Sequence, residues 1–276
     1  THPGSSAQPF ATIQRAMTVA ASGDTIKLRG AFHYEHEMDA LSKSFTIESE
    51  DHGNPATLVF EGYTGFDSFA GTLQYLNLIN AGAYGAVRYG NGSLTVQYCT
   101  FEDCNSSEDG GAIECLTALT VRHCLFRRCH ATRNGGAISA WYEATIEDCV
   151  FRDNDCDGAG GAISTEGALV SRCVFSNNRS DGSGEAICQY GMRMLTVVNC
   201  LFYDNGNANS SADHVISAVG PNSDLRIAEC TFADNHAAAV RAGDDSFVSV
   251  AHSIVYGNPA SFIEDSGGNV SCVVSD

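Results

Sequence analysis

Three aspartates stand at alternate positions in one short stretch, and their spacing suggests a cation site. In DNDCDG, Asp153, Asp155 and Asp157 are followed by Gly158. An EF-hand calcium loop begins in this way, because alternate carboxylates around a tight turn can converge on one hard cation. The twelfth position, which should hold a bidentate Glu, is Ser164. The stretch predicts Ca²⁺ as a candidate cofactor, with a solvated acidic turn as the alternative.

Three aromatic residues form a second candidate site. Trp141, the only tryptophan, and Tyr142 follow a GGAI motif, and Tyr190 holds the matching place after a GEAI motif. An aromatic face suits the apolar side of a pyranose ring. We expect these residues to contact carbohydrate or a surface partner, and ordinary surface packing is the alternative.

The twelve cysteines divide into groups by their spacing. Six belong to a repeated Cys-x-Phe motif, where the alternation with Phe points them into a core and favours a ladder of free thiols. Cys104 and Cys129 share a turn position and form the candidate disulfide. No pair has Cys-x-x-Cys spacing, so a zinc site has little support.

The Cys-x-Phe motif recurs at intervals of about 25 residues and aligns several other columns with it. Three residues before each Cys lies a β-branched residue, and an Asn follows in the turn of four of the six copies and of a degenerate seventh copy, Ser253/Val255. The Cys/Phe pairs begin at Cys99, Cys124, Cys149, Cys173, Cys200 and Cys230, and the turn residues are Asn154, Asn178, Asn205, Asn235 and Asn258.

Each repeat contains three short apolar segments, which are too short for helices and are separated by Gly, Asn and Asp. The β-branched residue and the Cys are three positions apart. In one straight strand an odd separation places two side chains on opposite faces, so the chain must turn a corner between them if both are to point inward. Three strands and three corners in about 25 residues predict one coil of a right-handed parallel β-helix, an all-β solenoid. Asn tolerates left-handed corners and can bond to the next Asn, so the Asn column predicts an internal ladder.

The sequence predicts a single β-helix domain over residues 1–276. In PFATIQRAMTVAASGD the apolar residues share one helical face, with Pro9 near the start and Gly23 past the end. This predicts a capping helix over 9–24. Irregular first coils are expected over 25–84 and regular coils over 85–258. Residues 259–276 are expected to be a last coil or the start of a C-terminal region that is missing.

The composition excludes several classes of partner. Asp and Glu total 33 against 15 Lys and Arg, giving a formal charge of −18. Such an acidic chain is a poor partner for nucleic acid or for an anionic membrane. No apolar run is long enough to span a membrane, so we expect no membrane insertion by this segment.

The GGAI motifs, with FRDN, FSNN, FYDN and FADN, resemble the GGAI and FxxN repeats of the chlamydial polymorphic outer membrane proteins and their relatives. Residues 9–37, from PFATIQ to HYEHE, look like the N-terminal coil of pectate-lyase-like proteins. The resemblance implies a secreted or cell-surface β-helix. It does not settle the activity, because one fold carries many functions.

Three functions remain open. The leading expectation is an adhesin-like or passenger-like binding surface directed at a polysaccharide or a cell-surface partner. The second is a polysaccharide lyase or glycoside hydrolase, for which the charge favours a neutral or calcium-bridged substrate. The third is a structural spacer. No catalytic residue and no oligomeric state is assigned, since the arginines form no column with carboxylates and a carboxylate pair needs a separation in space.

Overall fold

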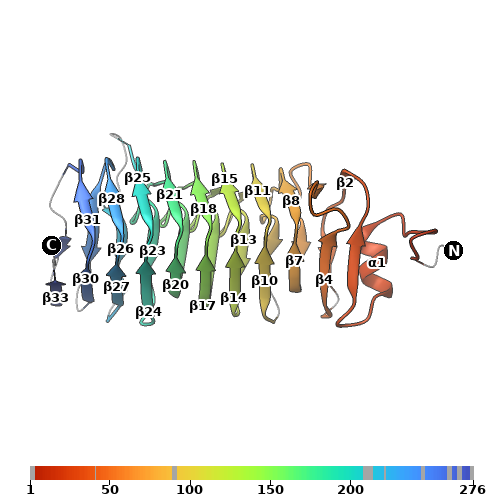
Figure 1. Cartoon of the computed structure of the whole chain (residues 1–276), viewed down its shortest axis with the longest axis horizontal. Coiled ribbons are helices and arrows are strands. Elements are labelled where there is room, and N and C mark those ends of the chain that lie inside the picture. Colours follow the sequence, from red (N-terminus) through yellow and green to blue (C-terminus); the bar gives the residue numbers. More distant parts are fainter. Residues whose placement is uncertain are drawn as a thin grey trace.

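The protein is a solenoid of coils stacked along one axis, as the predicted parallel β-helix requires. The computed structural model describes residues 4–40, 42–88, 92–207, 214–220, 222–243, 246–259, 263–265 and 269–273. Figure 1 shows the coils following one another from the helix at the N-terminal end to the other end of the molecule.

The strands of the described residues form three parallel sheets along the solenoid. The largest sheet contains β1 (Thr25–Leu28), β3 (Met38–Asp39), β4 (Ser44–Ser49), β6 (Phe66–Asp67), β7 (Ala70–Gln74), β9 (Val87–Arg88), β10 (Leu94–Gln97), β13 (Ile113–Cys115), β14 (Leu119–Arg122), β17 (Ile138–Glu147), β20 (Ile163–Ser171), β23 (Ile187–Gln189), β24 (Met194–Val198), β26 (His214–Ala218), β27 (Asp224–Ala228), β29 (Ala238–Ala242), β30 (Phe247–Ala251), β32 (Ile263–Asp265) and β33 (Asn269–Val273). The second contains β2 (Phe32–Tyr34), β5 (Ala56–Val59), β8 (Leu76–Ile79), β11 (Thr100–Glu102), β15 (Leu125–Arg127), β18 (Val150–Arg152), β21 (Val174–Ser176), β25 (Leu201–Tyr203), β28 (Thr231–Ala233) and β31 (Ile254–Tyr256). The smallest contains β12 (Asn105–Ser106), β16 (His130–Ala131), β19 (Asp155–Cys156) and β22 (Arg179–Ser180).

The repeat places equivalent residues directly above one another. Phe126 of β15 pairs with Phe151 of β18, and Val121 of β14 pairs with Ile146 of β17. The phenylalanines from Phe101 to Phe232 stack in the core with ring centroids 4.8–4.9 Å apart. This separation equals the distance between neighbouring strands, so one stack connects successive coils.

The asparagine ladder that the sequence predicts is present in the core. Asn178 accepts from Asn154 Nδ2 at 3.0 Å, and its own Nδ2 donates to Asn205 Oδ1 at 3.0 Å. The ladder continues through Asn235 to Asn258. Each amide also donates to a backbone carbonyl at the Phe of the preceding coil, as Asn178 does to Phe151 at 3.0 Å. The ladder thus satisfies backbone and side-chain groups that are away from water.

The described cysteines are buried free thiols, contrary to the candidate disulfide between Cys104 and Cys129. The Sγ of Cys104 lies 3.5 Å from the carbonyl oxygens of Leu78 and Glu102. Cys129 occupies the same column one coil later, where stacked strands direct their Cβ atoms in parallel and not toward each other. The predicted thiol ladder of the Cys-x-Phe column is confirmed, and its members accept hydrogen bonds from the backbone of the preceding coil, as Cys149 Sγ does from Cys124 N at 3.5 Å.

We expect the described thiols to be unreactive in the native protein. Burial raises the pKa of Cys124 and Cys188, and only the thiolate is a good nucleophile. Ellman's reagent should titrate these thiols only after unfolding in guanidinium, as followed by the absorbance of released thionitrobenzoate. Rapid reaction of several thiols before unfolding would contradict the buried ladder.

The N-terminal cap is a helix, α1, but it is shorter than the predicted 9–24. It runs over Ile13–Val19, with Thr12 as N-cap accepting from Arg15 N. Ala20 already has an extended backbone, and Pro9 lies outside the helix. Ile13 and Met17 are buried and cover the end of the core, which is the role expected of a solenoid cap. No helix in the described part of the chain is long and apolar enough to cross a membrane.

Candidate functional site

One outward face of the largest sheet carries polar side chains that are nevertheless buried. Glu114 of β13 pairs with Ser139 of β17, and Ser139 pairs with Ser164 of β20. We call these three residues the floor row. Their strands alternate, so that Ile113 and Ile138 point into the core while the floor row points outward. Neighbouring residues cover this face, so the exposed fraction of each of the three residues is below a tenth.

Ser139 and Ser164 of the floor row line a cavity of about 320 Å³, the polar groove, whereas Glu114 lies one strand beyond Ser139 and is not among the lining residues. Ser139, Ala140, Ser164 and Thr165 come from the strands themselves. Asp109 and Asn134 precede their strands in the chain, Trp141 and Glu166 lie within β17 and β20, and Tyr190 directly follows β23. A groove with a polar floor and aromatic sides is a common shape for a binding site.

Two local features of the sequence shape the polar groove. Gly135 has a φ of +68°, and a Cβ there would lie 2.1 Å from the carbonyl oxygen of Ile138. Only glycine fits this turn, which carries Asn134 into the wall. The pairing of β17 with β20 shifts between Ala140 and Glu143, where β17 has one residue more. Trp141 and Tyr142 are the two residues of β17 inside this bulge, and a bulge changes the direction of the side chains that it contains.

Glu114 has the most unusual environment of the floor row. It is only 4% exposed, and its Oε2 has no hydrogen-bond partner. Burial raises the pKa of its carboxyl to about 7, with a further contribution from the negative charge of Asp109. Arg88 and Arg133 act in the opposite direction without cancelling the rise. A carboxyl with a pKa near neutrality can either give or take a proton at physiological pH.

A chain of hydrogen bonds crosses the polar groove above the floor row. Asp109 Oδ1 accepts from the backbone N of Asn134 at 2.9 Å and from its Nδ2 at 3.0 Å. Asn134 Oδ1 in turn accepts from the Tyr190 hydroxyl at 3.3 Å. Burial, followed by the neighbouring Cys188, raises the pKa of the Tyr190 phenol, so this group is a proton donor and not a phenolate.

Two of the three predicted aromatic residues meet in the polar groove. Trp141 is 46% exposed and Tyr190 is 43% exposed, and both line it. Tyr142 does not line the groove. Its ring lies 5.0 Å from the guanidinium of Arg193, which also pairs with Glu143 and Glu166. The carbohydrate contact expected of these residues stays a prediction, which applies best to Trp141 and Tyr190.

The three aspartates of the calcium hypothesis are held by different partners. Asp153 pairs with Arg152 at 3.1 Å, and Asp155 Oδ2 lies 2.9 Å from His130 Nδ1. Asp157 is exposed. In the described part of the chain, no three His, Cys, Asp or Glu side chains form a group that could hold a metal ion. The structure therefore does not bring these three carboxylates together, and a calcium ion here remains an untested prediction.

The contact between Asp155 and His130 leads to a pH-dependent prediction. The hydrogen bond to Asp155 raises the pKa of His130 above its usual value of about 6.5. Its stabilising effect should be complete below that usual value and should be lost as the pH rises through the raised pKa. Asp155→Asn should therefore lower the melting temperature at pH 5.5 but not at pH 9, with a cost below about 1 kcal/mol. NMR titration of His130 should show its pKa falling in the variant, and an unchanged pKa would contradict the assignment.

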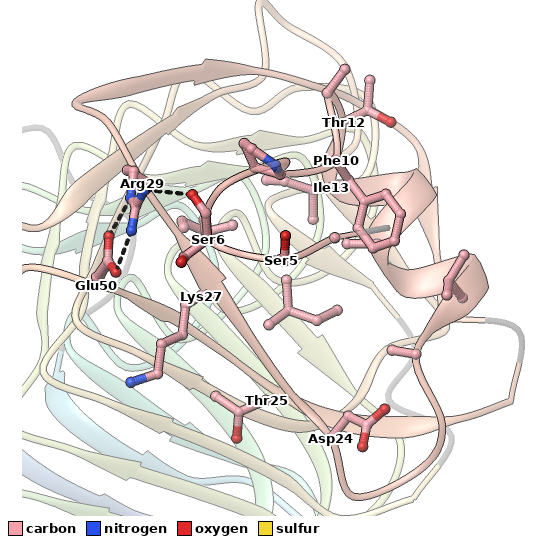
Figure 2. A pocket seen from close by; sticks show the side chains of 18 of the residues that line it. Ser5, Ser6, Phe10, Thr12, Ile13, Asp24, Thr25, Lys27, Arg29 and Glu50 are labelled. Atoms are coloured by element: carbon pink, nitrogen blue, oxygen red, sulfur yellow. Dashed lines mark hydrogen bonds and ion pairs between the residues drawn. The ribbon is translucent and has the colours of Figure 1, made fainter. Parts of the chain in front are cut away.

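A larger cavity, of about 720 Å³, lies at the N-terminal cap between α1 and β1. Figure 2 shows Arg29 at its edge, bonded to the carboxylate of Glu50 and to the carbonyl of Ser6. Lys27 is paired with Glu48 at 3.3 Å. Because these charges already have partners, this cavity offers less chemistry than the polar groove does.

Reasoning from the sequence missed Asp109, which lines the groove, and Glu114, which lies one strand beyond it. One signal was present in the sequence. Directly after the repeated Gly-Gly-Ala-Ile, the later coils have Ser139 and Ser164, whereas the first has Glu114. A charged residue in a column of small polar ones breaks the repeat, and such breaks are where a local function is expected.

The comparisons with known proteins agree with the fold. A family model described as "Right handed beta helix region" matches residues 65–208 and 135–275. A search of curated proteins found no match.

Solved structures of similar shape include several lyases. An alginate lyase in complex with a trisaccharide is 14% identical with a TM-score of 0.47, and the match covers 95% of this chain and 55% of that one. A mannuronic acid specific polysaccharide family 6 lyase from human gut microbiota is 11% identical with a TM-score of 0.47, covering 94% and 81%. An alginate lyase from Paenibacillus is 19% identical with a TM-score of 0.40, covering 93% and 96%.

Proposed function

The chain belongs to the right-handed β-helix family, and on this premise we propose that it is an enzyme that cleaves a polysaccharide bound in the polar groove. Of the functions expected from the sequence, this is the lyase or hydrolase alternative and not the adhesin-like surface. The observation that carries the proposal is Glu114, which lies one strand beyond the groove residue Ser139 and is a buried carboxyl with an unpartnered oxygen and a pKa raised to about 7. Strongly shifted pKa values in a cleft are typical of catalytic groups.

Glu114 is suited to proton transfer in either kind of cleavage. In hydrolysis the protonated carboxyl gives its proton to the glycosidic oxygen as the bond to the anomeric carbon breaks, and water supplies the new hydroxyl. In β-elimination the carboxylate takes the proton next to a uronate carboxyl while the bond to the leaving oxygen breaks. Tyr190 is the nearby group that can protonate a leaving oxygen, because burial keeps its phenol neutral.

The charge of the polar groove favours hydrolysis over elimination. Asp109 and Glu166 line the groove and Glu114 lies next to it, and within the described residues only Glu166 of these three forms an ion pair with an arginine, Arg193 at 3.7 Å. A uronate polymer would need a bridging cation to lie beside these carboxylates. A polymer without negative charge needs none.

A panel of polysaccharides tests the proposal. The protein is incubated with neutral, amino and uronic-acid polymers, each with calcium and with chelator. Reducing ends report either kind of cleavage, and absorbance of unsaturated products reports elimination alone. Turnover that disappears in Glu114→Gln supports the proposal. Silence across the panel, or turnover that Glu114→Gln leaves unchanged, would count against it.

A second candidate function is a binding surface without cleavage, as in the adhesin-like expectation. The exposed indole of Trp141 favours it, since a flat aromatic face on a solenoid can stack on a sugar ring. We expect Trp141→Ala to weaken oligosaccharide binding about tenfold, which calorimetry can measure. Tyr142→Ala is the matched control, because Tyr142 lies outside the polar groove. If Tyr142→Ala has the larger effect, the binding face is not the groove.

An extracellular or cell-surface location is part of the proposal. Structural polysaccharides are met outside the cell, and the acidic, lysine-poor composition suits such a setting. Burial of the thiols would protect them there from oxidation, because access and thiolate character control the reactivity of a cysteine.

A further inference from the structure

Several side chains that line the polar groove present polar atoms to which no described residue bonds, and these atoms limit the choice of substrate. We infer that the groove recognises a sugar through the hydrogens of its hydroxyl groups, with Asp109 as a residue that determines specificity. The substrate is thus a glycan whose hydroxyls are free at this site, and not one that carries O-acetyl, O-methyl or sulfate groups there. This choice of substrate rests on the proposed function, because it takes the groove to be the place where a polysaccharide binds.

Asp109 lines the polar groove and has one oxygen without a partner. Only 5% of the residue is exposed, and its Oδ1 accepts from the backbone N of Asn134 at 2.9 Å and from its Nδ2 at 3.0 Å. No described residue donates to Oδ2, yet this oxygen is accessible, whereas Glu114 Oε2 is covered. A carboxylate oxygen accepts hydrogen bonds and donates none, so Oδ2 is an acceptor that a ligand in the groove can satisfy.

The oxygen of the Tyr190 hydroxyl is a second acceptor. Its hydrogen is donated to Asn134 Oδ1 at 3.3 Å, and the backbone N of Ala159 donates to the same oxygen at 3.1 Å. Because an amide oxygen cannot donate, Tyr190 uses its only hydrogen in this bond, and its lone pairs are left for a donor in the groove. Asn134 therefore holds both acceptors in place, one through its nitrogens and the other through its oxygen.

The floor of the groove adds two hydroxyls. Ser139 and Ser164 are opposite each other on β17 and β20, and both are buried and line the groove. No described residue bonds to either Oγ, whereas the hydroxyl of Thr165 already donates to the carbonyl of Gly167 at 3.1 Å. A hydroxyl can donate or accept, so the two serines can bond to a sugar hydroxyl in either role.

The balance of donors and acceptors identifies the chemistry of the ligand. A buried acceptor without a donor costs free energy, and a sugar hydroxyl supplies the missing hydrogen. An ether or ester oxygen only accepts, so it would face Asp109 Oδ2 as one acceptor against another. Sulfate and uronate groups would also be repelled by the carboxyls of Asp109 and Glu166, which line the groove. An ammonium group offers no acceptor for the serine hydrogens, whereas a hydroxyl both donates and accepts.

The first test uses the wild-type protein alone and so does not depend on the folding of any variant. A glycan array presents neutral oligosaccharides beside their O-acetylated, O-sulfated and amino forms. Isothermal titration calorimetry then compares the tightest neutral ligand with its monodeoxy and mono-O-methyl analogues. We expect loss of a recognised hydroxyl to weaken binding at least about tenfold, as for a hydrogen bond to a charged group. The deoxy analogue should lose as much as the O-methyl one, because the missing hydrogen is the cause and not added bulk.

Two isosteric variants then assign hydroxyls to residues. In Asp109→Asn the two N–H donors of Asn134 should keep the amide oxygen at the place of Oδ1, so that the amide nitrogen replaces Oδ2 and a donor replaces an acceptor. This variant should bind the O-methyl analogue at one sugar position about as well as the parent glycan. Tyr190→Phe should remove the discrimination at a second position.

Each variant has a matched control outside the groove. Asp204→Asn removes an exposed carboxylate at a left-handed corner that asparagine tolerates. Tyr142→Phe removes the hydroxyl of a tyrosine that does not line the groove. Both controls should keep the wild-type discrimination at every sugar position. Circular dichroism confirms that each variant is folded.

Each outcome decides the inference. It is overturned if no neutral glycan binds, if a sulfated, acetylated or amino form binds more tightly, or if the deoxy analogues bind as well as the parent. Discrimination that Asp109→Asn leaves unchanged at every position overturns the role of Asp109. The proposed function fails in a different way, through absence of Glu114-dependent turnover on every polymer. Hydroxyl-dependent binding without turnover would keep the inference and remove only the cleavage.

Discussion

Glu114→Gln is expected to lower kcat for polysaccharide cleavage by about 10²- to 10⁴-fold, the usual contribution of a general acid or base. Glutamine has nearly the same shape and can fill the same buried place, but its amide cannot exchange a proton. The loss should appear in kcat more than in KM, because the group acts in the transition state and not mainly in binding. Initial rates from reducing ends give both constants.

Glu166→Gln is the matched control within the polar groove. Glu166 lines it, and its carboxylate is about 40% exposed and paired with Arg193. Its loss should change kcat by less than about tenfold, as expected for an exposed ion pair. If both variants lose activity equally, Glu114 has no special role in proton transfer.

The pH profile shows which proton transfer Glu114 performs. The pKa of its carboxyl is raised to about 7, so it is protonated below and ionised above that pH. If it acts as an acid, activity falls as the pH rises through about 7. If it acts as a base, activity rises over the same range. In Glu114→Gln this limb should be absent from whatever activity remains, and a limb that persists would assign it to another group.

Asn178→Ala is expected to lower the free energy of unfolding by about 2 to 6 kcal/mol. Asn178 Oδ1 accepts from the backbone N of Asn154 at 3.2 Å, and its Nδ2 donates to the carbonyl of Phe151 at 3.0 Å. Alanine leaves both backbone groups buried without a partner, at about 1 to 3 kcal/mol each. Urea denaturation followed by circular dichroism measures the change.

Asn258→Ala provides the comparison at the end of the ladder. Asn258 makes the same kinds of bond, to Asn235 and to the carbonyl of Phe232, but it is only partly buried. Water can replace its bonds there, so the loss should be clearly smaller than that of Asn178→Ala. Equal losses would mean that the ladder is not stabilised by the burial of its amides.

The fold could be predicted from the sequence because the same pattern of inward-pointing residues recurs in successive coils. The Phe, β-branched and Asn columns each recur in several coils, so the prediction of the fold does not depend on a chance match at any one position. The cap was harder, since apolar periodicity over 9–24 does not reveal that Thr12 begins the helix and Ala20 ends it. The disulfide expectation failed because a shared turn position says nothing of the direction of the two Cβ atoms.

The site could be predicted only in part, because it is assembled from residues that the repeat does not constrain. Trp141 and Tyr190 were found because aromatic residues are conspicuous in a sequence. Glu114 was not, since its burial depends on the walls formed by neighbouring coils. The bulge that separates Trp141 from Tyr142 depends on the length of β17 relative to β20, which only the aligned strands reveal.

The registration of one coil on the next has a consequence for how this molecule can change over evolutionary time. Because every column continues straight through, duplication or loss of one whole repeat leaves the Phe stack, the Asn ladder and the cap unaltered. Duplication or loss of the coil that carries β17 or β20 would insert or remove one step between Glu114 and Tyr190. Recombination within the gene can therefore lengthen or shorten the polar groove in units of a coil while Glu114 keeps its place in the first GGAI coil.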